Sequence, residues 1–235
     1  MLHTLLALAL ADEAGDALLA KVDAANNAGD DAHLVLDVVV TDDKGESAQR
    51  TLEIWQKGDD KRLVRYTEPA RLAGIGLLVP DGETVYVYLP AYGRPKRVVG
   101  DQRSDAFMGT DFSIDDLSRL SWSEEYSAIV EGTDGEMTTL LLTPNDPKQH
   151  EHHHVRMWVR PDDHLPSVIE YSDEDNVRIR TVTLTDYRDV GPRNLAHTLH
   201  VLDNDKGTST EATVNEVAFD AGLDDELFTL TALTR

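Results

Sequence analysis

Hydrophobic and polar residues alternate along most of this chain, from residue 33 to residue 218. A period of two is the period of a β-strand that buries one face and exposes the other. The alternating segments are rich in Val, Leu, Ile, Thr and aromatic residues, and turn-forming clusters of Asp, Asn, Gly and Pro separate them. The pattern predicts strands at 33–41, 48–57, 61–67, 76–80, 84–89, 125–131, 137–143, 152–160, 167–172, 177–187, 195–203 and 209–218.

A meander of about ten strands with few helices is typical of a curved antiparallel sheet or an open barrel. The chain has no internal repeat, low-complexity tract or linker, so we expect residues 12–235 to form a single domain. The predicted fold class is α+β, with antiparallel β-structure as the main component.

Two segments favour helix. Residues 12–29 are rich in Ala and end in a helix-stopping cluster of two Asn and one Gly. Their apolar residues at helical spacing are Ala14, Leu18, Val22 and Ala25. Further along, Ser113 is placed as an N-cap with Asp116 three residues later, which is the spacing of a capping box. Residues 90–112 are expected to be irregular, and 224–228 to form a short acidic turn or helix.

The charge and the missing cysteine exclude several classes of function. Asp and Glu number 44 against 22 Lys and Arg, which gives a formal net charge of -22. A nucleic-acid partner needs a basic face, so this balance argues against one. A chain without Cys has no disulfide scaffold, no thiolate zinc site, no Cys nucleophile and no lipidated cysteine.

The N-terminus resembles an export signal. Residues 1–11 are apolar, end in Ala9-x-Ala11 and are followed at once by Asp12 and Glu13, which is the pattern of a cleavable signal peptide. The basic region that usually begins such a signal is missing, so the alternatives are a start codon further upstream or the first turn of a helix. An exported protein of this kind would be periplasmic in a cell with two membranes, soluble and not lipidated.

A histidine cluster is the one candidate for a metal site. His150, His152 and His154 alternate within residues 149–154, and two histidines on one face of a strand can chelate zinc or copper. The alternative is a solvated strand entry that faces water. The chain has no G-x-S-x-G elbow, S-x-x-K or H-E-x-x-H motif, so we expect no enzymatic activity, no catalytic residues and no cofactor.

One block carries a family signature. It is Phe107-Met108-Gly109-Thr110-Asp111-Phe112-Ser113-Ile114-Asp115-Asp116-Leu117, which is close to F-x-G-S-D-[FL]-[ST]-x-[ED]-D-L. With the segments 65–74, 77–78, 85–91 and 219–229, the chain resembles the outer-membrane lipoprotein-sorting proteins of the LolA-like superfamily, in a less characterised branch. Thr110 stands where Ser is usual, and Val85-Tyr86 stand where Trp is common.

The resemblance implies a strongly curved, open half-barrel with helices over its concave face, and acyl chains held between them. A strand Arg bonds to the lid in the best-studied carriers, and Arg65 is the nearest candidate here. We expect the lid to contain Phe112, Ile114, Leu117 and Leu120, beside the signature residues Gly109, Asp111 and Asp116. The concave surface beneath is expected to include Leu52, Ile54, Leu77, Val85, Val87 and Trp158.

The resemblance also implies partners. Cargo would be an acylated lipoprotein or a lipid, received from an inner-membrane transporter of ABC or RND type and passed to an outer-membrane acceptor through transient contacts. Two alternatives remain open at this point. The same fold could serve as a periplasmic sensor or regulatory binding module, or the three histidines could make the protein a metal-dependent enzyme.

Overall fold

The computed structural model describes residues 2–147 and 152–235, with the side chains of residues 13–100, 102–147 and 152–235. In chain order the elements are α1 (Leu2–Asn26), β1 (Asp31–Thr41), β2 (Ser47–Lys57), β3 (Lys61–Glu68), β4 (Gly76–Val79), β5 (Val85–Tyr88), η1 (Pro90–Tyr92), β6 (Lys96–Val98), η2 (Gly100–Ser104), η3 (Phe107–Gly109), α2 (Ile114–Ser118), β7 (Tyr126–Asp134), β8 (Met137–Pro144), β9 (His154–Val159), β10 (Pro166–Ser172), β11 (Arg178–Val190), β12 (Arg193–Asp203), β13 (Thr208–Phe219), η4 (Asp225–Phe228) and α3 (Leu230–Leu233).

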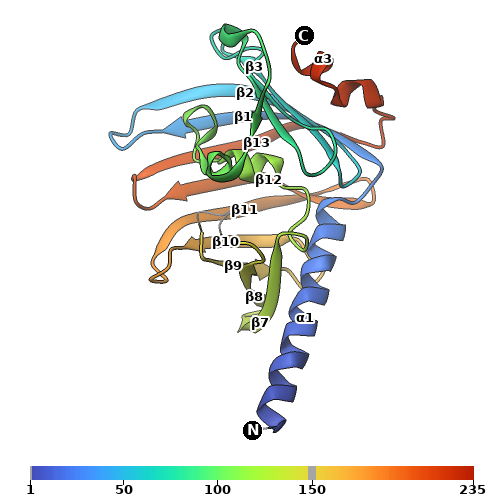
Figure 1. Cartoon of the computed structure of the whole chain (residues 1–235), viewed down its shortest axis with the longest axis vertical. Coiled ribbons are helices and arrows are strands. Elements are labelled where there is room, and N and C mark those ends of the chain that lie inside the picture. Colours follow the sequence, from blue (N-terminus) through green and yellow to red (C-terminus); the bar gives the residue numbers. More distant parts are fainter. Residues whose placement is uncertain (1, 148–151) are drawn as a thin grey trace.

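All thirteen described strands form one antiparallel sheet, in the order β6-β5-β4-β3-β2-β1-β13-β12-β11-β10-β9-β8-β7. Strands adjacent in sequence are adjacent in the sheet, except for β6 and β7, which lie at its two edges. In addition, β1 pairs with β13, the last strand of the chain. The sheet curves strongly and stays open (Figure 1). The predicted fold class, an open and strongly curved antiparallel sheet with few helices, is confirmed.

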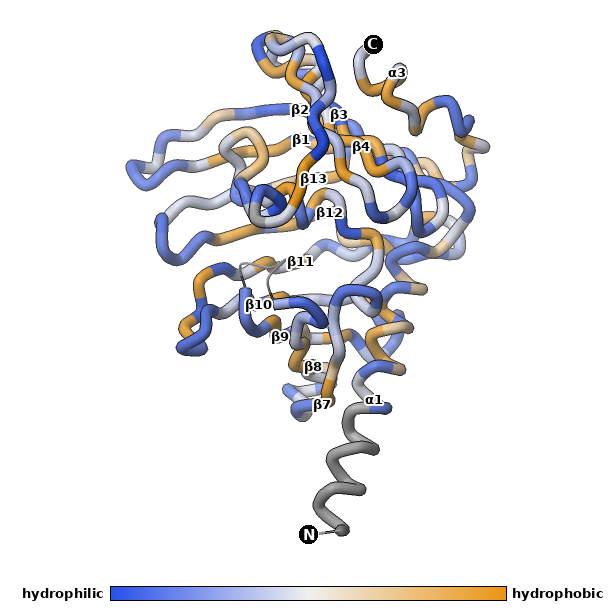
Figure 2. The backbone as a smooth tube through the Cα atoms, in the orientation of Figure 1, coloured by the Kyte–Doolittle hydropathy of each residue, from blue (hydrophilic) through white to orange (hydrophobic). Residues whose placement is uncertain are grey.

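Side-chain alternation divides the sheet into two faces. In β9, for example, Val155, Met157 and Val159 are buried and the residues between them are partly exposed. The buried residues of the concave face form two clusters, one centred on β1–β5 and one on β7–β11. Figure 2 shows hydrophobic segments along these strands and hydrophilic turns at their ends.

The opposite, outer face is covered in one place by the end of the chain. Phe228 of η4 and Leu233 of α3 pack on Leu63 and Leu78, which point outward from β3 and β4. This third cluster explains why β3 and β4 are buried on both faces, whereas most strands are buried on one.

Helix α1 lies against the β7 edge of the sheet (Figure 1). Gly15, Leu19 and Val22 are buried at i, i+4 and i+7, so the buried stripe differs from the predicted one, in which Ala14 faced the core. Ala14 is exposed because the glycine beside it, having no Cβ, lets the helix contact the backbone of β7. The helix also begins earlier than residue 12, and cleavage after residue 11 stays a prediction.

Strand β6 is absent from the predicted elements because three residues are too few to display a period. It lies inside the stretch 90–112, which is otherwise irregular as expected, with η1, η2 and η3 in place of longer elements. None of the helices in the described part of the chain is both long enough and apolar enough to cross a membrane.

Candidate functional site

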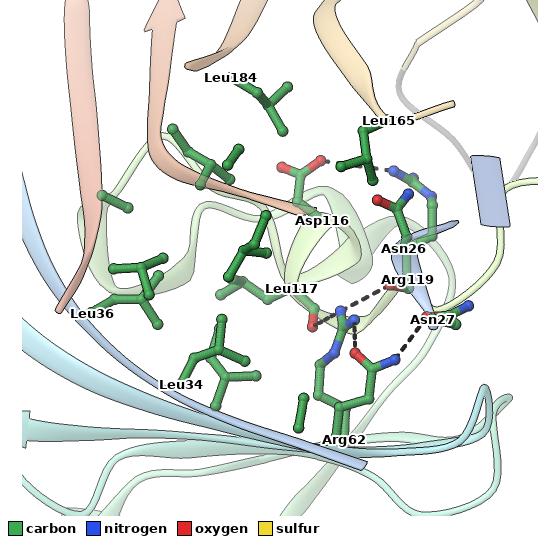
Figure 3. Close-up of a pocket in the computed structure, with 18 of the residues that line it drawn as sticks. Asn26, Asn27, Leu34, Leu36, Arg62, Asp116, Leu117, Arg119, Leu165 and Leu184 are labelled. Atoms are coloured by element: carbon green, nitrogen blue, oxygen red, sulfur yellow. Dashed lines mark hydrogen bonds and ion pairs between the residues drawn. The ribbon is translucent and has the colours of Figure 1, made fainter. Parts of the chain in front are cut away.

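A cavity of about 340 Å³ lies on the concave face of the sheet, beneath the segment 107–120, which we call the lid (Figure 3). Most of its walls are aliphatic and come from strands far apart in the sequence. The apolar lining includes Leu34, Leu36, Val38, Leu52, Ile54, Phe112, Leu117, Leu120, Ile169, Val182, Leu184, Leu195, Leu199 and Val214. Five of the predicted site residues are in this list: Leu52, Ile54, Phe112, Leu117 and Leu120.

Other predicted residues lie close to the cavity without lining it. Leu77, Val85, Val87 and Ile114 are buried in the cluster on β1–β5, where they support the lid and its neighbouring strands. Trp158, by contrast, was wrongly placed on the concave face. It alternates with Met157, which is fully buried, so it lies on the outer face, where its Nε1 donates a hydrogen bond to Asp134.

The signature residues hold the lid in place. Asp116 closes a capping box at the start of α2, since its carboxylate accepts from the Ser113 amide at 2.8 Å while the Ser113 hydroxyl accepts from the Asp116 amide. Asp111 accepts hydrogen bonds from the Thr208 and Thr210 hydroxyls of β13. Gly109 has a φ of +73°, a region that glycine enters without strain. The signature block is therefore the part of the lid that fixes its shape and its attachment.

Buried arginines join the lid to the second half of the sheet. The Arg180 guanidinium of β11 donates to both carboxylate oxygens of Asp116, at 2.6 and 2.9 Å. Arg119 forms ion pairs with Asp115 and Glu125. Burial raises the pKa of Asp116, but the charges of Arg180 and Arg119 outweigh burial and hold it below its ordinary value of 3.8. Asp116 is therefore a carboxylate at neutral pH.

A strand arginine does bond to the lid, and it is Arg62 rather than Arg65. The Arg62 Nη1 donates to the backbone oxygens of Leu117 and Arg119, at 3.1 and 2.9 Å (Figure 3). Arg65 lies on the outer face, where its Nη2 donates to the Ala232 oxygen at 2.6 Å. The prediction for Arg65 was wrong because the two residues are three apart in one strand, which places their side chains on opposite faces.

A chain of amides continues from Arg62 to the end of α1. Arg62 donates to the side-chain oxygen of Gln56, and the Gln56 amide donates to Asn27 at 2.7 Å. The Asn27 amide then donates to the Leu120 oxygen, also at 2.7 Å. This polar network ties the sheet, the lid and the C-terminal end of α1 together at one side of the cavity.

Among the described residues, the predicted metal ligands form no metal site. Strand β9 begins at His154, so the alternation that paired His154 with His152 does not extend to His152. His152 instead packs on Tyr171, and its Nε2 lies 3.4 Å from the Arg180 Nη2. Burial, and then the charge of Arg180, lower the pKa of His152 to about 3. His150 lies outside the described residues, and within them no three His, Asp or Glu side chains form a metal site.

Comparison with known proteins assigns the chain to a family and finds solved structures that share its fold. A family model with the description "Uncharacterized protein" matches residues 58–235, which is more than half of the chain. The chain belongs to this family. No curated protein matches this family member in sequence.

Solved structures share its fold. A candidate outer membrane lipoprotein-sorting protein domain from Vibrio parahaemolyticus has a TM-score of 0.84 and 24% identity, over 95% of this chain and 100% of that one. A DUF1329 family protein from Desulfovibrio piger has a TM-score of 0.85 and 22% identity, over 95% and 99%. A LolA superfamily protein from Nitrosomonas europaea has a TM-score of 0.77 and 17% identity, over 92% and 97%. The fold is therefore LolA-like.

Sequence reasoning missed Arg62, Gln56, Asn27 and Arg180. A signal for two of them was present: Arg62 is in phase with Val64 and Tyr66, and Arg180 with Val182, so each is a charged residue at an inward position of its strand. No comparable signal marks Asn27, because its role depends on how α1 meets the lid.

Proposed function

We propose that this protein is a carrier that binds acyl chains of lipids or lipoproteins in the cavity and moves them between inner- and outer-membrane partners. The observation that carries the proposal is the aliphatic cavity between the concave sheet and the lid. Its volume of about 340 Å³ lies within the range of about 300–1,000 Å³ that is usual for small-molecule sites.

The lid gives the proposed carrier a way to release what it binds. Burying an acyl chain stabilises the complex by about 0.8 kcal/mol per CH₂, so a chain of ordinary length would leave an open apolar groove slowly. In the closed structure the lid donates its own apolar side chains, Leu117 and Leu120, to the cavity. Closure of the lid on an emptied cavity therefore offsets part of the binding free energy, and Arg62 strengthens that closure.

The proposed location is the periplasm, and the proposed partners are an inner-membrane transporter of ABC or RND type and an outer-membrane acceptor. The apolar residues 1–11, which end in Ala9-x-Ala11, support export. If the signal is removed after Ala11, the remaining part of α1 still contains the residues that pack on the sheet, Leu19 and Val22.

A cavity-filling substitution tests the proposal. Leu34 lines the cavity, and its neighbour Val35 points to the other face of β1. The measurement is the apparent affinity for dodecanoate, obtained from its displacement of a fluorescent apolar probe. We expect Leu34→Trp to lower this affinity at least tenfold and Val35→Trp to leave it unchanged. Equal binding by both variants, each shown by circular dichroism to be folded, would contradict the assignment of the cavity as the acyl site.

A further inference from the structure

Arg62 is the one cavity arginine in the described structure that no carboxylate neutralises. Three arginines line the cavity. Arg119 pairs with Asp115 and Glu125, and Arg193 pairs with Asp220. Among the described side chains, those of residues 13–100, 102–147 and 152–235, Arg62 has no such partner. Its acceptors are two backbone oxygens of the lid and one amide oxygen.

The Arg62 guanidinium also has hydrogen-bonding capacity left over. An arginine carries five N–H donors, and three hydrogen bonds account for three of them. Its Nε is buried and makes no hydrogen bond. Burial, together with the charge of Arg119, lowers the pKa of Arg62 to about 10, so the side chain remains a cation at neutral pH. A cation held at an apolar wall with an unused donor is costly unless an anion reaches it.

Opening of the lid would free donors of Arg62. The guanidinium would lose both backbone acceptors, and Gln56 would be its remaining acceptor within the protein. A ligand with a neutral head group would leave the guanidinium in that state. A carboxylate or phosphate would replace the two carbonyls with charged acceptors, and a guanidinium binds such groups through two parallel hydrogen bonds.

We propose that the cavity takes a single-chain amphiphile with an anionic head group, and that the head group binds Arg62 in place of the lid carbonyls. This inference rests on the proposed function and adds the class of cargo to it. A volume of about 340 Å³ lies near the lower end of the usual range for ligand sites, so it favours one chain over several. The net charge of -22 does not oppose the binding strongly, because salt screens exposed charges within about 8–10 Å.

The test compares three ligands with the same chain: dodecanoate, dodecyl phosphate and dodecanol, each competing with a neutral fluorescent probe. We expect the wild-type protein to bind at least one of the two anions about tenfold more tightly than dodecanol. The preferred anion then identifies the head group as carboxylate or phosphate. In Arg62→Gln we expect this preference to disappear while dodecanol still binds.

Two further variants separate the role of charge from effects on folding. Arg65→Gln, on the outer face of the same strand, also loses a hydrogen bond to a backbone oxygen and should keep the full preference. Arg62→Lys keeps the positive charge but loses the planar guanidinium that forms two parallel hydrogen bonds, so it should keep part of the preference for the anion. A preference that survives in Arg62→Gln, or is absent from the wild type while dodecanol binds, would overturn this inference and leave the carrier function standing. Failure of all three ligands to bind the wild type would contradict both.

Discussion

At the scale of single residues, the position of a residue in the alternation of its strand decides whether its side chain faces the cavity or the outer face of the sheet. Aliphatic residues such as Leu52 and Ile54 were placed in the cavity because hydrophobic alternation reports the buried face directly. Arg65 was the nearest candidate that the resemblance offered, but the residue that contacts the lid is Arg62, which is in phase with the inward-facing Val64 and Tyr66. Trp158 lies on the outer face because its neighbours Met157 and Val159 occupy the inward positions of β9.

The buried pair of Asp116 and Arg180 gives a prediction for stability. Replacing Asp116 by Asn removes the only carboxylate that Arg180 contacts among the described residues and leaves a buried cation uncompensated. We expect Asp116→Asn to lower the free energy of unfolding by about 3–5 kcal/mol at pH 7, measured by urea denaturation. The matched control is Asp186→Asn, which breaks an exposed pair with Arg188 and should have no measurable effect.

The same pair predicts a dependence on pH. Because the pKa of Asp116 is lower in the folded protein than its ordinary value of 3.8, the pair contributes fully above that value. The contribution is lost as the pH falls through the folded pKa. The difference in unfolding free energy between the wild type and Asp116→Asn should therefore shrink below pH 4. A difference that stays constant down to pH 2 would contradict the assignment.

At the scale of elements, nearly all strands could be predicted, because each is long enough to show alternation and is bounded by turn residues. The exception, β6, has three residues. The capping box at Ser113 was also predictable, since its signal is local and depends only on spacing. The contacts of the lid with β3 and β11 were not predictable, because they depend on how a curved sheet brings distant strands under one segment.

The contact of α1 with β7 gives a prediction at this scale. A Cβ added at Gly15 would overlap the backbone of Ala128 and lie 2.7 Å from the Ile129 Cα. We expect Gly15→Ala to lower the free energy of unfolding by about 1–3 kcal/mol, because the helix must move away from the strand. Gly132→Ala in β7 is the control, since a Cβ there would meet nothing within 4 Å. Equal stability of the two variants would show that α1 does not pack on β7 as described.

The lid gives a second prediction. Leu117 lines the cavity, so Leu117→Asp places a carboxylate on an apolar wall and weakens closure of the lid. We expect the affinity for an acyl probe to fall about tenfold or more. Leu202→Asp, at an exposed position of β12, should bind as the wild type does. Unchanged binding by Leu117→Asp would show that the lid does not form part of the acyl site.

At the scale of the whole molecule, fold and charge support the same function. A sheet that stays open has a concave face that must be covered, and here a short lid covers it with side chains that contact the cavity. A net charge of -22 favours the solubility of the proposed carrier despite its apolar cavity.

Native mass spectrometry tests the central claim most directly. The protein is isolated from the envelope of its own cells under gentle conditions, and its spectrum is recorded before and after lipid extraction. The account predicts an adduct with the mass of a single-chain amphiphile, present before extraction, absent after it, and absent from Leu34→Trp. A spectrum of ligand-free protein that also acquires no adduct from added dodecanoate or dodecyl phosphate would contradict the account.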